Sequence, residues 1–172
     1  GGMGAIFCSA MAATPTVVVT AAHCLDQFDD AGGDPVVFLV NTEAGGMAYR
    51  TRPETRTSHA RWPDHEYDLG VFSISSPLPN TIYPFIRSTP VTASQVGTSL
   101  IAVGWGETVP DAGDAGVKRS VPMKIASTSG PFFVVRHDEG WRGVCHGDSG
   151  GPSILVTGAR NELWGIHARS RD

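Results

Sequence analysis

Short apolar stretches, each bounded by Gly, Pro, Asp or Ser, recur along the whole chain. Their β-branched residues and short lengths predict strands over residues 16–20, 36–40, 70–74, 99–103, 132–135 and 154–156. The small, apolar stretch 1–13 is interpreted as a further strand. A helical apolar period appears only around 21–28, where a turn of helix is expected. Because a parallel α/β sheet needs long crossover helices, the pattern predicts an all-β protein.

A proline-rich passage divides this pattern into two halves of similar character. Its prolines are Pro77, Pro79, Pro84 and Pro90. We expect residues 1–80 to form a first β-barrel, 81–97 a linker and 98–172 a second barrel. Domain junctions are common places for binding sites, so the cleft between the barrels is the expected place of the functional site.

Composition removes several functional classes. The chain has 172 residues, of which 41% are hydrophobic, and a net charge of −4. It can therefore bury a core, and without a basic stripe it is not expected to bind nucleic acid. No apolar run reaches the ~18 residues of a membrane-spanning helix, so no membrane contact is expected. Residues 1–13 lack the basic start of a signal peptide, so any export signal is expected to lie outside this sequence or to have been removed.

The candidate chemistry lies in separate motifs. They are Thr20-Ala21-Ala22-His23-Cys24, Asp68-Leu69-Gly70-Val71, Gly104-Trp105-Gly106 and Gly147-Asp148-Ser149-Gly150-Gly151-Pro152. Each alone is compatible with an ordinary turn, a helix start or a strand cap. Together they give the chain order His, Asp, Ser, and unrelated folds that use these residue types have them in other orders.

From Cys8 to about Ser170 the chain resembles the chymotrypsin/trypsin family of serine endopeptidases. The resemblance implies two antiparallel β-barrels of the six-stranded type, incomplete at both termini. It also implies a secreted protease, which we expect to be of the bacterial type. Protein or peptide substrates and protein inhibitors are the implied partners, and no cofactor or metal is expected.

The resemblance also assigns roles to the motif residues. Ser149 is the implied nucleophile, and His23 is the base that activates its hydroxyl. Asp68 orients the imidazole and stabilises its protonated form. The backbone amides of Gly147 and Ser149 form the implied oxyanion hole, where a side chain at position 147 would crowd the substrate.

The three cysteines leave one thiol over. By resemblance, Cys8 pairs with Cys24, the residue after the candidate base. The family partner of Cys145 would lie beyond Asp172. Within this sequence, Cys145 is equally well interpreted as a small buried hydrophobe.

Specificity is expected to depend on residues near Ser149. Gly143 stands at the implied base of the pocket, where a carboxylate would select Arg or Lys, and Val144 follows it. An apolar or small substrate side chain is therefore expected. His146 and the segment after the strand around Trp164-Gly165-Ile166 complete the expected pocket; the members of that segment taken as wall residues are Ala168, Arg169 and Ser170.

Other interpretations remain beside this one. Gly147 to Gly151 fits the nucleophile elbow of α/β-hydrolases, but Pro152 and a strand follow, and no Asp lies between Ser149 and the downstream His167. Zinc-ligand types occur in two sets without close paired spacing: Cys8, His23, Cys24 and Cys145, and His59, Asp64, His65 and Glu66. Asp26, Asp29, Asp30 and Asp34 form an acidic segment better explained by solvation than by calcium. A catalytically silent or zymogen-like homologue that serves as a binding module is the alternative function.

Overall fold

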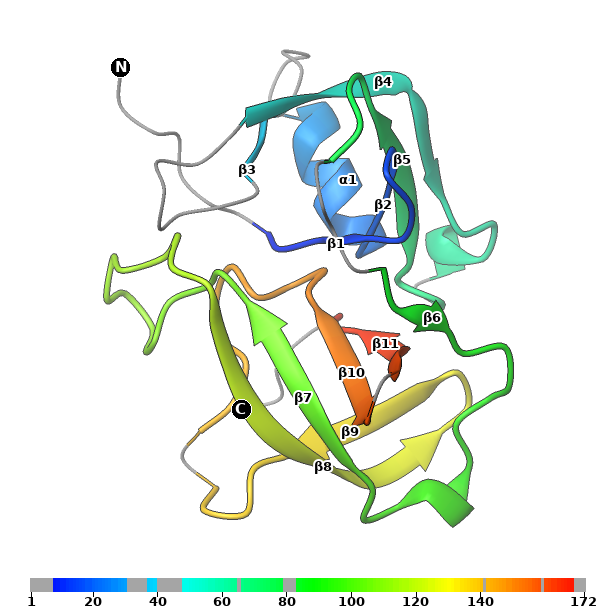
Figure 1. The fold of residues 1–172 in the computed structure, drawn as a ribbon, viewed down its shortest axis with the longest axis vertical. Helices are drawn as coiled ribbons and strands as arrows, with labels where there is room; N and C mark the ends of the chain where they lie inside the picture. Colours follow the sequence, from blue (N-terminus) through cyan, green and yellow to red (C-terminus); the bar gives the residue numbers. More distant parts are fainter. Residues whose placement is uncertain are drawn as a thin grey trace.

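The computed structural model describes residues 8–30, 37–39, 48–64, 66–78, 83–140, 142–158 and 160–168. These residues form two β-sheets, one from each half of the sequence, as Figure 1 shows. Helical structure is limited to α1 (Ala22–Asp30) and two short 3-10 turns, η1 (Trp62–Asp64) and η2 (Ala93–Gln95), among the described residues. No helix in these ranges is long and apolar enough to cross a membrane. The all-β prediction is confirmed.

The first sheet contains five described strands in the order β1-β2-β5-β4-β3. They are β1 (Met11–Ala12), β2 (Val17–Thr20), β3 (Val37–Leu39), β4 (Ala48–Ser58) and β5 (Gly70–Ile74), and every pair is antiparallel. In β5 the buried positions alternate with half-buried ones, which is the pattern of a strand with one face on a core. Residues of β2, α1, β4 and β5 meet in that core, which contains Ala10, Val18, Leu25, Tyr49, Phe72, Ile74 and Leu78.

The second sheet contains six strands in the order β6-β11-β10-β7-β8-β9. They are β6 (Phe85–Ile86), β7 (Ser99–Gly104), β8 (Arg119–Ser129), β9 (Phe132–Arg136), β10 (Pro152–Thr157) and β11 (Arg160–Ile166). β6 runs parallel to β11, and the other neighbours are antiparallel. Its buried apolar side chains include Leu100, Ala102, Met123, Ile125 and Leu163.

Each predicted strand overlaps an observed one, and α1 covers the predicted helical turn. The predictions miss β4, β6 and β8. The interpretation of residues 1–13 as one strand is wrong where the structure describes them, because residues 8–10 are irregular and β1 covers only Met11–Ala12. Within the expected linker 81–97, Phe85 and Ile86 pair with β11 and so extend the second sheet. The domain boundaries 1–80 and 98–172 stay predictions.

Candidate active site

His23 lies in the first turn of α1, directly after β2. The helix packs closely on β5 because position 70 is glycine: a Cβ there would lie 2.6 Å from Cδ1 of Leu25. A disulfide joins Cys24 to Cys8, with the two Cα atoms 6.2 Å apart, and so ties the helix to the segment before β1. The local sequence thus fixes the backbone of His23 from both sides.

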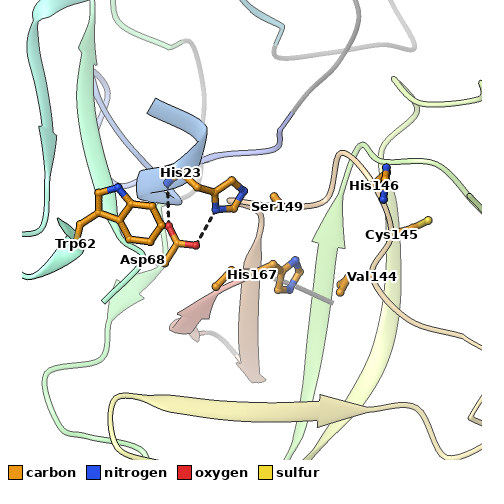
Figure 2. Close-up of a pocket in the computed structure, with 9 residues that line it drawn as sticks. His23, Trp62, Asp68, Val144, Cys145, His146, Ser149 and His167 are labelled. Atoms are coloured by element: carbon orange, nitrogen blue, oxygen red, sulfur yellow. Dashed lines mark hydrogen bonds and ion pairs between the residues drawn. The ribbon is translucent and has the colours of Figure 1, made fainter. Parts of the chain in front are cut away.

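Two hydrogen bonds join His23 to Asp68, which precedes β5. Oδ1 of Asp68 accepts the backbone N–H of His23 at 2.9 Å. Oδ2 of Asp68 lies 2.7 Å from Nδ1 of the imidazole, as the dashed lines in Figure 2 show. The Asp68 side chain is only 3% exposed and that of His23 is 24% exposed. Because a carboxylate only accepts, Nδ1 of the neutral ring carries the proton and Nε2 does not.

The backbone before Asp68 is in the left-handed region. Tyr67 has a φ of 52°, which is uncommon for a residue with a side chain. Its ring stacks on His59 with centroids 4.5 Å apart, and the guanidinium of Arg61 lies 5.3 Å from the ring centroid. Arg61 also forms an ion pair with Glu66. These contacts hold the turn that directs Asp68 toward His23.

Ser149 lies in a loop that only glycine-rich sequence can form. Gly147 and Gly150 have φ values of 89° and 82°, in the left-handed region. A Cβ on Gly150 would overlap Oγ1 of Thr20 and the carbonyl oxygen of Ser9. The backbone conformation therefore favours glycine at both positions, and at position 150 the neighbouring atoms also leave no room for a side chain.

The carboxylate of Asp148 holds this loop in place through hydrogen bonds to the backbone. It accepts the backbone N–H of Gly106 at 2.8 Å and that of Cys145 at 2.8 Å. A Cβ on Gly104 would overlap the same carboxylate, and one on Gly106 would lie 2.8 Å from its carbon. The Gly104-Trp105-Gly106 motif is thus explained by the close approach of Asp148.

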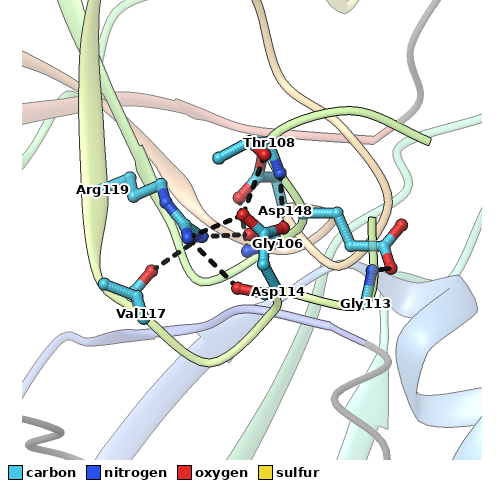
Figure 3. A network of polar contacts seen from close by, with 8 residues as sticks. Gly106, Thr108, Gly113, Asp114, Val117, Arg119 and Asp148 are labelled. Carbon is cyan, nitrogen blue, oxygen red and sulfur yellow. Dashed lines mark hydrogen bonds and ion pairs between the residues drawn. The ribbon is translucent and has the colours of Figure 1, made fainter. Parts of the chain in front are cut away.

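Hydrogen bonds made by Arg119 and Asp114 hold Gly106 in place (Figure 3). The guanidinium of Arg119 donates to the carbonyl of Gly106 at 2.8 Å and to the carboxylate of Asp114 at 3.0 Å. Asp114 also accepts from the backbone and the hydroxyl of Thr108, and these bonds, followed by the charge of Arg119, lower the pKa of the Asp114 carboxyl against the opposing effect of burial.

Ser9 connects the Ser149 loop to the first sheet. Its backbone N–H donates to the carbonyl of Ser149 at 2.7 Å, and its hydroxyl donates to the carbonyl of Gly147 at 2.7 Å. The same hydroxyl accepts the N–H of Trp105 at 2.9 Å, and the carbonyl of Ser9 accepts the hydroxyl of Thr20 at 2.9 Å. The sequence analysis did not identify Ser9; its position next to Cys8 was the only available signal.

His23, Asp68 and Ser149 line one cavity of about 350 Å³, together with Trp62, Val144, Cys145, His146, His167 and Ala168. Figure 2 shows the imidazole of His23 lying between Asp68 and the Ser149 loop. Sγ of Cys24 packs 3.5 Å from Nε2 of His23 and 3.7 Å from the carbonyl oxygen of Ser149. Among the described residues, no hydrogen bond joins the side chains of His23 and Ser149 in this structure.

The expected pocket residues divide into three groups. Val144, His146 and Ala168 line the cavity. Gly143 is exposed and is not a lining residue, and a Cβ on it would meet nothing within 4 Å. Arg169 and Ser170 lie outside the described residues. The sequence analysis missed Trp62, which comes from η1, and did not count His167, the first residue of the segment after the Trp164-Gly165-Ile166 strand, among the wall residues.

The metal alternatives gain little from the geometry. Cys8, His23 and Cys24 place possible ligand atoms within 4.8 Å of one another. However, the two sulfurs share a disulfide, and a metal would need a thiolate. Of the second set, His65 lies outside the described residues, as does Asp34 of the acidic segment.

The two sheets give the chain a chymotrypsin-like all-β fold, and His23, Asp68 and Ser149 line one cavity. The family model of trypsin matches residues 1–171, and the chain belongs to this family of serine proteases.

Three similar proteins come from animals, and they lend no support to the expected bacterial type. Brachyurin of Leptuca pugilator is 29% identical over 162 residues, which cover 85% of this chain and 70% of the relative. Trypsin-1 of Salmo salar is 24% identical over 174 residues, covering 93% and 69%. Transmembrane protease serine 11E of Mus musculus is 23% identical over 172 residues, covering 91% of this chain but only 40% of the mouse protein.

Proposed function

We propose that this chain is the catalytic part of a serine endopeptidase in which Ser149 is the nucleophile, His23 the general base and Asp68 the residue that orients the base. The observation that carries the proposal is the 2.7 Å contact between Nδ1 of His23 and Oδ2 of Asp68, at a cavity that Ser149 also lines. This bond selects the tautomer in which Nε2 is free to take a proton.

The chemistry follows from these positions. Nε2 of His23 accepts the hydroxyl proton as Oγ of Ser149 attacks the peptide carbonyl, and the buried carboxylate of Asp68 stabilises the resulting imidazolium. The imidazolium then donates its proton to the leaving amine. Water, activated by the same His23, hydrolyses the acyl-enzyme in a second half-reaction.

The oxyanion of the tetrahedral intermediate needs donors that are not already engaged. Within the part of the chain that the structure describes, the amides of Gly147 and Ser149 donate to no protein acceptor. The positive φ of Gly147 and the two hydrogen bonds that the Asp148 carboxylate accepts from backbone N–H groups hold this loop in shape. This supports the assignment of these amides as the oxyanion hole.

Protein or peptide substrates with an apolar side chain before the scissile bond are the proposed substrates. Among the lining residues that the structure describes, Asp68 is the only carboxylate, and His23 occupies it. An Arg or Lys side chain would therefore lose water without gaining a partner. The Cys8–Cys24 disulfide supports an extracellular location, since such bonds persist in oxidising compartments.

A small fluorophosphonate probe tests the proposal on the purified protein, expressed with its natural flanking segments. We expect labelling of Ser149, found by peptide mass spectrometry, and loss of labelling in Ser149→Ala. Ser127→Ala, at an exposed serine in β8, is the matched control and should label normally. An unlabelled wild type would favour the silent or zymogen-like alternative.

A further inference from the structure

His167, directly after β11, makes all of its hydrogen bonds to the segment around Ser149. It is only 8% exposed. Its backbone N–H donates to the carbonyl of Gly151 at 2.8 Å, and its carbonyl accepts the N–H of Gly150 at 2.7 Å. Nδ1 of its ring lies 3.3 Å from the carbonyl oxygen of Asp148, and Nε2 lies 3.1 Å from Oγ of Ser153.

These ring contacts define one tautomer. A carbonyl oxygen only accepts, so Nδ1 of His167 carries the proton and donates to Asp148. Nε2 then carries no proton and accepts a hydrogen bond from the hydroxyl of Ser153. Both nitrogens are thus engaged within the protein. Although His167 lines the cavity, a polar substrate group would have to displace one of these bonds to reach the ring.

The carbonyl that His167 binds belongs to the peptide unit between Asp148 and Ser149. That unit is planar and trans, so the direction of its C=O fixes the direction of its N–H. The N–H is that of Ser149, one of the two proposed oxyanion donors. Gly151 also donates to this carbonyl, at 2.9 Å, so the oxygen is held by two donors. A hydrogen bond at the oxygen also polarises the peptide and strengthens its N–H as a donor.

We infer that His167 is a positioning residue for catalysis, whose Nδ1–H holds the Asp148–Ser149 peptide so that the Ser149 amide is directed at the oxyanion. The inference rests on the proposed function of Ser149. His167 touches neither the nucleophile's hydroxyl nor, by this inference, the substrate; it acts through the peptide bond that it holds.

Two substitutions separate this role from simple packing. His167→Asn keeps an N–H donor near the position of Nδ1, whereas His167→Gln places its amide near the position of Nε2 and leaves the Asp148 carbonyl without the side-chain donor. We expect His167→Asn to remain within about threefold of wild type in kcat. We expect His167→Gln to lose about 100-fold, the scale of a small misplacement of catalytic groups.

The readouts are kcat and KM on a peptide substrate and the rate of labelling by a small fluorophosphonate. The phosphonyl oxygen uses the oxyanion site but the reagent has no peptide side chains. His167→Gln should lower kcat and the rate of labelling together and leave KM unchanged. Melting temperatures of both variants are measured alongside, and ¹⁵N NMR of the wild type should show His167 as the Nδ1–H tautomer even if a variant fails to fold.

Several outcomes would overturn the inference. If kcat fell equally in the Asn and Gln variants, in step with their melting temperatures, His167 would have only a packing role. A change in KM that depends on the substrate side chain, with unchanged labelling, would mean a direct substrate contact. An Nε2–H tautomer would reverse the assigned hydrogen bonds. If wild type labels at Ser149 and the Gln variant labels equally fast, this inference fails alone; if wild type does not label, the proposed function fails with it.

Discussion

Asp68 engages His23 with both of its carboxylate oxygens, one on the backbone N–H and one on Nδ1 of the ring. The first bond fixes where the carboxylate sits relative to α1, and the second fixes the ring. Since the two bonds use different oxygens, the position of the Asp68 carboxylate and the tautomer of the His23 imidazole are set together. The pair is therefore preorganised without substrate.

Asp68→Asn tests this coupling. The amide can keep the bond to the backbone of His23 through its oxygen, but its NH₂ then faces Nδ1 and favours the tautomer with the proton on Nε2. His23 is then unable to accept the Ser149 proton, and we expect kcat to fall by about 10⁴-fold with little change in KM. Steady-state kinetics measures this. Asp138→Asn, at a surface residue paired with Lys124, is the control and should be close to wild type.

Gly150→Ala should destabilise the protein far more than Gly113→Ala. Both positions have positive φ, 82° and 66°, so both substitutions strain the backbone. Only at Gly150 would the new Cβ also overlap Thr20 and Ser9; at Gly113 it would meet nothing within 4 Å. The difference in urea-unfolding free energy isolates the steric part, and we expect it to exceed about 2 kcal/mol. Equal effects would mean that the contact with the first sheet is easily relaxed.

Ser9→Ala removes the hydroxyl that bridges the Ser149 loop to Trp105. The carbonyl of Gly147 loses its donor and the N–H of Trp105 loses its acceptor, at a site where Ser9 is 4% exposed. A buried polar group left without a partner costs about 1–3 kcal/mol, and we expect a loss in that range by chemical denaturation. Ser120→Ala, an exposed serine of β8, should change stability by less than about 0.5 kcal/mol. A similar small effect at Ser9 would mean that the bridge is dispensable.

Local patterns predicted the parts of the fold that carry their own signal. β5 and β7 alternate buried and less buried residues, and the motif residues His23, Asp68 and Ser149 all reach one cavity. β4 and β8 were missed because their sequences do not clearly show the two-residue alternation of apolar and polar residues that is typical of a strand. β4 is polar and shifts register between Arg52 and Thr57, while β8 contains Pro122, which argues against a strand.

The supporting residues of the site could not be predicted for a different reason. Ser9 and Gly147 are 138 positions apart, and nothing in either local sequence reports their hydrogen bond. The same holds for His167, whose ring partners lie in the Ser149 loop and in β10. Such contacts depend on how the sheets and loops pack, which no window of sequence contains.

The stability of the protein should fall in acid partly because of His167. Burial lowers the pKa of this imidazole from its ordinary 6.5, against the raising effects of the Asp148 charge and of the bond to the Asp148 carbonyl. Below pH 6.5 the unfolded chain therefore binds a proton that the folded protein does not. The contribution of His167 to the free energy of unfolding is full above pH 6.5. It is lost as the pH falls, by at most about 1.4 kcal/mol per pH unit.

His167→Asn removes this proton uptake. The difference in unfolding free energy between the variant and wild type should therefore change with pH. Between pH 7.5 and 5, wild type should lose more unfolding free energy than the variant, measured by urea titration at each pH. The other titratable groups near His167 are present in both proteins; they are Asp148 in the same loop and His23, Asp68, Cys145 and His146 around the cavity. Parallel pH curves for the two proteins would show that His167 is not held neutral.

Cleavage should occur chiefly after apolar residues. An apolar side chain entering the cavity gains about 25 cal/mol per Å² of surface buried, whereas Arg or Lys meets no unoccupied carboxylate among the described lining residues. A peptide library profiled by mass spectrometry measures the preference. Val144→Asp adds a carboxylate at the cavity wall and should increase cleavage after Arg and Lys. Gly143→Asp, where a Cβ faces open space, should do so less. Dominant cleavage after Arg or Lys by wild type would instead require a carboxylate from residues that the structure does not describe.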